Sequence, residues 1–138
     1  MPRTSLRHRA ALLGLLLCTA ACAGLGSRPG SDQRQLEVLA SAYNSLPGQT
    51  SDQPDIAAWG DRLVPGMRSI AVSRDLLELG LGHGSVVRID GLPGEYRVLD
   101  KMAKRWRRKI DIYMGTDVSA AREWGVREVT IRWAPTQR

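Results

Sequence analysis

Cysteine is scarce in this sequence, and phenylalanine is absent altogether. The two cysteines, Cys18 and Cys22, both stand near the start, so the rest of the chain has no pair that forms a disulfide. His83 lies in a glycine-rich turn with no second histidine and no cysteine nearby, so we expect neither a metal site nor a cofactor. A hydrophobic core is therefore expected to hold the fold together.

A long apolar segment is missing too. The apolar run from Ala10 to Ala21 is about 12 residues long, which is too short to span a bilayer comfortably as a helix. It follows three arginines, and this order of a basic and then an apolar region is typical of a signal peptide. Residues 1–22 are therefore predicted to be a signal peptide, and the protein to be exported to the cell envelope or periplasm.

The end of this leader has two interpretations. Small residues precede Cys22 in Thr19-Ala20-Ala21-Cys22, which resembles a lipobox, and diacylation of Cys22 would anchor the protein to a membrane. Alternatively, Ala21-Cys22-Ala23 is an ordinary cleavage site. Residues 23–34 are rich in Gly, Ser and Pro and are predicted to be a flexible tether. One domain over residues 35–134 and a polar tail over 135–138 complete the chain.

Within the domain, short strand-like segments are separated by Gly/Pro turns, which is typical of a small closed β-barrel. The pattern at 36–43 fits either a strand or a short helix. The other strands are expected over 69–73, 85–89, 95–100, 110–114 and 127–133, with short helices over 75–79 and 118–124. There is no internal sequence repeat. The predicted fold class is mainly β.

Two aspartates and a basic loop stand out in the second half of the domain. Asp100 ends one predicted strand, and Asp111 lies between Ile110 and Ile112, on the opposite face from both isoleucines. The nine residues from Lys101 to Lys109 hold six cations, no acid and one tryptophan. Two carboxylates beside such a loop form a candidate site. The alternative is a pair of solvated aspartates flanking a basic hairpin loop.

The order of several motifs resembles a known family. Ala42-Tyr43-Asn44 comes first, the Asp100 strand and Ile110-Asp111-Ile112-Tyr113 follow, and Ala120-Ala121-Arg122-Glu123-Trp124-Gly125 comes near the end. This order resembles the three-aspartate (3D) domain over about residues 35 to 133. That domain is a double-psi β-barrel, shared with membrane-bound lytic murein transglycosylases and muralytic stationary-phase survival proteins. The resemblance implies a six-stranded double-psi barrel with one or two short helices, in which residues 36–43 form the first strand.

The resemblance also implies a function. It predicts an exported cell-wall protein that cleaves peptidoglycan glycan strands, as a lytic transglycosylase-like enzyme or a glycosidase. By position in the motif, Asp111 matches the catalytic acid and Asp100 the supporting aspartate. In the lytic reaction the C6 hydroxyl of muramic acid attacks in place of water and gives a 1,6-anhydro product. Burial and Asp100 are expected to raise the pKa of Asp111, whereas the basic loop lowers it.

The sequence departs from the family pattern at two places. The family's third aspartate is replaced by Gly115, with Asp117 two positions later, and Asp117 is also a candidate helix N-cap. After Asp100, Lys101-Met102-Ala103 replaces the Thr-Gly-Gly of the transglycosylase branch. These differences leave open an alternative function, a non-catalytic module that binds peptidoglycan or an envelope partner.

The remaining predicted contacts are with the substrate. Trp59 and Trp106 lie in loop-like stretches suited to stacking on sugar rings, whereas Trp124 and Trp133 are expected in the core. Tyr43 is a candidate sugar contact or a core tyrosine. We expect the basic loop to bind an anionic glycan, lipid headgroups or an acidic partner, and we expect no nucleic acid partner in an exported protein. The predicted substrate-binding residues are Tyr43, Lys101, Arg105, Trp106, Tyr113 and Asp117.

Overall fold

The computed structural model describes residues 32–47 and 53–135. The predicted signal peptide, Cys22 and most of the predicted tether lie outside these residues. The strands are β1 (Arg34–Tyr43), β2 (Ser69–Val72), β3 (Val86–Ile89), β4 (Tyr96–Lys101), β5 (Lys109–Tyr113) and β6 (Arg127–Trp133). The helices are α1 (Arg74–Glu78) and α2 (Val118–Trp124). Each predicted strand and helix is present within a few residues of its expected position.

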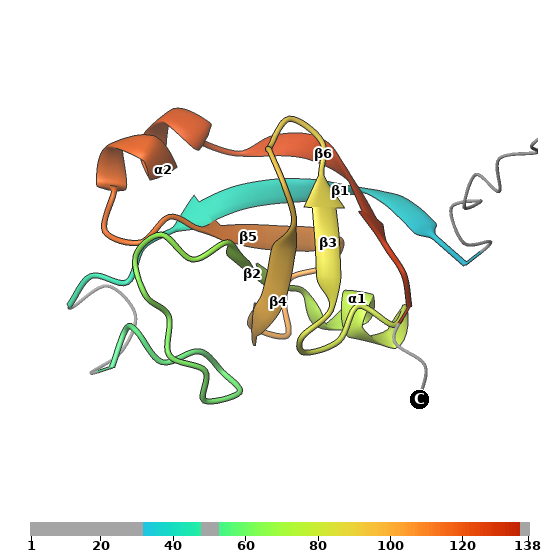
Figure 1. The fold of residues 1–138 in the computed structure, drawn as a ribbon, viewed down its shortest axis with the longest axis horizontal. Helices are drawn as coiled ribbons and strands as arrows, with labels where there is room; N and C mark the ends of the chain where they lie inside the picture. Colours follow the sequence, from blue (N-terminus) through green and yellow to red (C-terminus); the bar gives the residue numbers. More distant parts are fainter. Residues whose placement is uncertain (1–31, 48–52, 136–138) are drawn as a thin grey trace, which may run out of the picture.

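The six strands close into one barrel in the order β1-β5-β2-β4-β3-β6 (Figure 1). β1 runs parallel to β5 and β2 runs parallel to β4, whereas the other four pairings are antiparallel. Closure leaves none of these strands with an unpaired edge. The predicted fold class, a small six-stranded double-psi β-barrel with short helices, is confirmed.

The barrel is built from two interlocked halves of the same design. β1, β2, α1 and β3 form the first half, and β4, β5, α2 and β6 form the second. Exchanging β1 with β4, β2 with β5 and β3 with β6 reproduces every strand pairing with its direction. The topology therefore has a pseudo-twofold symmetry at the β2–β5 pair, although the sequence contains no detectable repeat.

Alternation along the strands sends one apolar row into the barrel. In β1, Val38 and Ala40 are buried in the core, and in β5 the same holds for Ile110 and Ile112. Trp133 is buried in this core and Trp124 packs against it, as the sequence predicts. Burying a large aliphatic side chain contributes roughly 1.5–3 kcal/mol, so this row is the main source of stability.

α2 lies against the end of β1, and its two ends follow the sequence prediction (Figure 1). The Asp117 carboxylate accepts a hydrogen bond of 2.9 Å from the Ala120 amide, which satisfies one donor of the first turn. Gly125 ends the helix with a φ of 64°, a conformation that favours glycine. Among the described residues, no helix is long and apolar enough to cross a membrane.

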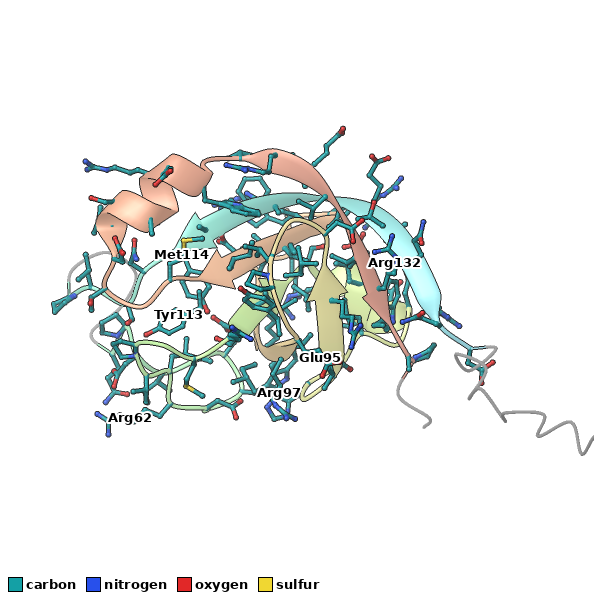
Figure 2. The ribbon with its side chains drawn as sticks, turned by 45° about the horizontal axis from the view of Figure 1, so that its top comes forward. Arg62, Glu95, Arg97, Tyr113, Met114 and Arg132 are labelled. Atoms are coloured by element: carbon teal, nitrogen blue, oxygen red, sulfur yellow. The ribbon has the colours of Figure 1, made fainter. Side chains whose placement is uncertain are left out.

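A second, smaller apolar cluster lies outside the barrel core. Ala57 and Leu63 of the segment 53–67 pack there against Leu99 of β4 and Tyr113 of β5. Figure 2 shows Tyr113 at the end of β5, on the side of the loop that carries Arg62. We call the segment 53–67 the roof loop, because this cluster seats it over the outer surface of β4 and β5.

Candidate functional site

Four neighbouring strands bring four residues into one row on the outside of the barrel. The register pairs Ser41 of β1 with Asp111 of β5, Asp111 with Ala71 of β2, and Ala71 with Asp100 of β4. Because neighbouring strands lie about 4.8 Å apart, the backbones at Asp100 and Asp111 are roughly 10 Å apart, with Ala71 between them. The two predicted catalytic aspartates therefore belong to one site.

A β-bulge is what turns Asp100 out of the core. The register between β2 and β4 passes from Ile70 opposite Val98 to Ala71 opposite Asp100, which leaves Leu99 as the extra residue. Strict alternation would place Asp100 on the same side as the core residue Val98. The bulge instead lets Leu99 join the outer cluster and brings Asp100 into the row with Asp111.

The row forms part of a groove of about 360 Å³. Tyr43 and the two aspartates line it together with Ala71, and the roof loop contributes Pro54, Ile56 and Ala58. The opposite wall comes from the start of the basic loop and is formed by Lys101, Met102, Ala103 and Trp106. Ile56 and Trp106 remain 40% and 37% exposed, so apolar surface is available on both sides of the carboxylates.

Asp111 lies in an environment that favours its protonated form. Burial raises the pKa of its carboxyl group, and the charge of Asp100 raises it further. The Ser41 hydroxyl, which donates a 2.9 Å hydrogen bond to the Asp111 carboxylate, and the charge of Lys109 both lower the pKa. The net shift is upward, so burial outweighs the basic loop, a balance that the sequence leaves open.

Asp100 has a different environment, because it holds the roof loop in place. One of its oxygens accepts a 2.7 Å hydrogen bond from the Ala58 amide and a 2.8 Å hydrogen bond from the Lys101 amide. The first bond joins the roof loop to β4 directly. Asp100 therefore shapes the groove as well as placing negative charge near Asp111.

Tyr43 brings its hydroxyl group to the same groove. The hydroxyl is buried beside the Asp100 carboxyl group, while the ring packs on Tyr113 with centroids 5.5 Å apart. Burial raises the pKa of Tyr43, and the charges of Asp100 and Asp111 raise it further. The Tyr43 hydroxyl therefore keeps its proton.

Two tryptophans each have a lysine ammonium group over the ring. The Lys109 ammonium lies 3.8 Å from the ring centroid of Trp106, and the Lys101 ammonium lies 5.1 Å from that of Trp59. Arg105 also lies over Trp106, at 5.2 Å. Trp106 lines the groove, whereas Trp59 lies against His83 with ring centroids 5.0 Å apart. Of the two predicted stacking residues, only Trp106 is placed to stack on a ligand in the groove.

The basic loop is fixed at one residue, Arg108. Its backbone φ is 45°, its amide donates to the Asp75 carboxylate at 2.9 Å, and its guanidinium donates to the Glu37 carbonyl at 3.1 Å. The pKa of Asp75 is lowered, because hydrogen bonds from Ser73 and the Arg108 amide outweigh the effect of burial. Arg108 is therefore an anchor of the loop, and the exposed cations that remain for a partner are Lys104, Arg105 and Arg107.

Three predicted substrate-binding residues, Arg105, Tyr113 and Asp117, lie outside the groove lining. Tyr113 is buried in the outer cluster, and its hydroxyl lies 2.7 Å from that of Ser45. Asp117 caps α2. The position of the family's third aspartate, Gly115, has a φ of 57°, and a Cβ there would lie 3.1 Å from the Cα of Pro65. The roof loop therefore packs where that aspartate's side chain would start.

The sequence interpretation missed Ser41 and Ala71 in the row, and it missed one contact of the roof loop. Alternation from Tyr43 places Ser41 on the same face of β1, so that signal was available. The missed contact joins the exposed His83 ring nitrogen to the Asp61 carboxylate at 2.6 Å. The described residues contain no cluster of three or more His, Cys, Asp or Glu side chains that would hold a metal ion.

Comparisons with known proteins do not assign the chain to a family. No protein-family model and no curated protein matches it. Among solved structures, it resembles an apo expansin from Clavibacter michiganensis, with 19% identity over 76% of this chain and 52% of that chain and a TM-score of 0.49. A mutant of that bacterium's expansin in complex with cellohexaose gives 18% identity, coverage of 75% and 51%, and a TM-score of 0.45. The chain spans about half the length of these expansin chains, and the resemblance to the 3D domain stays a prediction.

Proposed function

We propose that the groove binds a glycan strand of peptidoglycan and that Asp111 protonates the oxygen of its glycosidic bond. The observation that carries this proposal is the buried carboxyl group of Asp111, with its raised pKa, in a groove that also contains a second carboxyl group. Cleavage of a glycosidic bond needs a protonated acid beside the leaving oxygen and negative charge near the oxocarbenium-like centre. Asp111 and Asp100 match these two needs.

The lytic reaction uses one carboxyl group twice. Asp111 gives its proton to the leaving oxygen as the glycosidic bond breaks, and the carboxylate of Asp111 then accepts the proton of the C6 hydroxyl group. That hydroxyl oxygen bonds to the anomeric carbon and closes the 1,6-anhydro ring, so no water is consumed. Ser41 orients the carboxyl group through its hydrogen bond. Trp106 offers an aromatic face to a neighbouring sugar ring.

Digestion of purified sacculi tests this function. We expect soluble products that end in 1,6-anhydromuramic acid, and a hydrolase would give reducing ends instead. Asp111→Asn is the matched control, because the amide keeps the shape of the side chain without an acidic proton. Absence of both kinds of product with correctly folded wild-type protein would refute glycan cleavage.

A second candidate function is a binding module without catalysis. It is favoured by the side chains of Lys101, Met102 and Ala103, which line the groove where glycines would let a glycan approach the backbone. In that case Asp111→Asn should leave function intact. Neutralising the exposed cations Lys104, Arg105 and Arg107 together should then remove most of the binding, in a salt-dependent way.

The proposal includes export and attachment to a membrane through Cys22. Its support is the order of basic, apolar and small residues before Cys22. The intact mass of protein from the membrane fraction tests it, and we expect a mature chain that begins at a diacylated Cys22. An unmodified mature chain that begins after Ala23 would show ordinary cleavage and would contradict the lipid anchor.

A further inference from the structure

Lys101 is an unpaired cation in the wall of the groove. It follows Asp100 directly, its side chain is half-buried, and it lines the groove between the roof loop and Met102. It forms no ion pair with any other described residue. Its ammonium group instead lies over Trp59, which contacts His83 on the roof-loop side. Because Lys101 lines the groove and has no carboxylate partner among the described residues, its charge is available to an anionic group on a ligand.

Lys109 provides a contrast within the same site. It also lies over a tryptophan and forms no ion pair with a described residue, but its side chain is only 9% exposed. Unlike Lys101, it is not among the residues that line the groove, and its charge lowers the pKa of Asp111. The two lysines are thus placed for different tasks, Lys101 for contact with a ligand and Lys109 for adjusting the acid.

We propose that Lys101 binds a carboxylate of the glycan, so that the groove prefers acidic strands whose sugar carboxylates are free. This inference rests on the proposed function, in which a glycan strand occupies the groove. In peptidoglycan, the carboxylate on the short ether arm of muramic acid is free only where the peptide has been removed. The preferred substrate is therefore a peptide-free strand.

The chemistry of the wall supports a carboxylate close to the sugar ring. Lys101 and Asp100 line the same groove, so a ligand that contacts Lys101 also lies beside a carboxyl group of the site. A lysine ammonium is a compact point charge with three donors, which suits a single carboxylate. An amide at the same place would carry no charge and would leave the lysine unpaired in a partly desolvated wall.

The test compares two forms of the same strands. Peptide-free strands are prepared from amidase-treated sacculi, and half are converted to methylamides at their carboxyl groups. We expect the full wild-type chain to bind the free-acid strands roughly tenfold more tightly, equivalent to about 1.4 kcal/mol. Lys101→Met should bring this ratio close to one, because methionine keeps the packing on Trp59 without the charge. Lys101→Arg should retain most of the preference.

Two control variants separate this role from general charge. Lys104→Met makes the same charge change in an exposed loop residue outside the groove lining and should keep the tenfold ratio. Lys109→Met should also keep the ratio, but should move the pH profile of cleavage to higher pH, because Lys109 lowers the pKa of Asp111. Circular dichroism confirms that each variant is folded before its binding is compared.

Each outcome decides one proposal. Equal affinity of the wild type for the two strand forms would overturn carboxylate binding by Lys101. An unchanged ratio of the two affinities in folded Lys101→Met would do the same. Cleavage of both forms without preference would leave the proposed function in place and reject this inference. Carboxylate-dependent binding without any cleavage product would support carboxylate binding by Lys101 and reject glycan cleavage, because the binding assay does not depend on turnover.

Discussion

The two halves of the barrel have the same topology and contribute different chemistry. At matching positions of the row, the first half places Ser41 on β1 and Ala71 on β2, whereas the second half places Asp100 on β4 and Asp111 on β5. Both carboxyl groups therefore come from the second half. The first half supplies a hydroxyl that holds Asp111 and a small side chain that leaves space between the aspartates.

This difference separates what builds the fold from what builds the site. The inward residues of the two central strands are aliphatic, Ile70 and Val72 in β2 and Ile110 and Ile112 in β5. The outward residues differ completely, because nothing in the core restricts them. A symmetrical barrel thus carries an asymmetric groove.

Asp111→Asn should have the largest effect among changes in the outward row, because it removes the acidic proton and keeps the shape of the side chain. We expect turnover of sacculi to fall by roughly 10²–10⁴-fold, with binding almost unchanged. The variant should also gain stability relative to wild type as pH rises, since the buried carboxyl group no longer has to ionise. Unchanged turnover in a folded Asp111→Asn variant would show that Asp111 is not the catalytic acid.

Ala71→Val tests the contribution of the first half to the groove. The added methyl groups enter the space between Asp100 and Asp111, on a strand where valine is otherwise well suited. We expect glycan binding to weaken by about tenfold, or roughly 1.4 kcal/mol, with the barrel intact. Ala103→Val, on the exposed wall of the groove, is the matched control. Equal affinities of wild type and Ala71→Val would show that the ligand does not occupy this space.

Asp100→Ala should release the roof loop. The amides of Ala58 and Lys101 lose their shared acceptor, and the loss of a typical hydrogen bond lowers the free energy of unfolding by about 0.5–1.5 kcal/mol. Asp100→Asn keeps an oxygen acceptor and should retain most of that stability. Hydrogen exchange at the Ala58 amide, followed alongside urea unfolding, measures both effects. Equal exchange rates in wild type and Asp100→Ala would contradict the anchoring role.

Asp117→Ala should have a smaller effect, confined to α2. Loss of the N-cap typically costs about 1 kcal/mol, and Asp117 lies outside the groove lining, so turnover should not change. Asp117→Ser, which retains a capping oxygen, should restore the stability. A large loss of turnover in folded Asp117→Ala would instead return Asp117 to the site as a third functional aspartate.

Much of the fold could be predicted from the sequence, because alternation and turn residues are local signals. Asp111 between two isoleucines and the Asp117 cap are examples in which the pattern and the structure agree. The bulge at Leu99 was not predictable from alternation, since it depends on how β4 pairs with β2. Asp100 was placed beside Asp111 by resemblance, and only the strand register gives the physical reason.

The contacts of the roof loop could not be predicted from the sequence either. The Ala58 amide meets Asp100 across 42 positions of the chain, and Gly115 makes room for Pro65. Such contacts join segments that are far apart and have no periodic signature. The direction of the pKa shift of Asp111 likewise depends on its depth of burial, which no residue count gives.

A titration of the Asp111 carboxyl group by NMR tests the central claim most directly. We predict a pKa above the ordinary aspartate value of 3.8, because burial and Asp100 outweigh Ser41 and Lys109. Ser41→Ala should move the pKa further upward, and Asp100→Asn should move it down. Cleavage should be present at low pH and lost as pH rises through the same midpoint. A pKa at or below the ordinary value would contradict the account, since Asp111 would then hold no proton to donate.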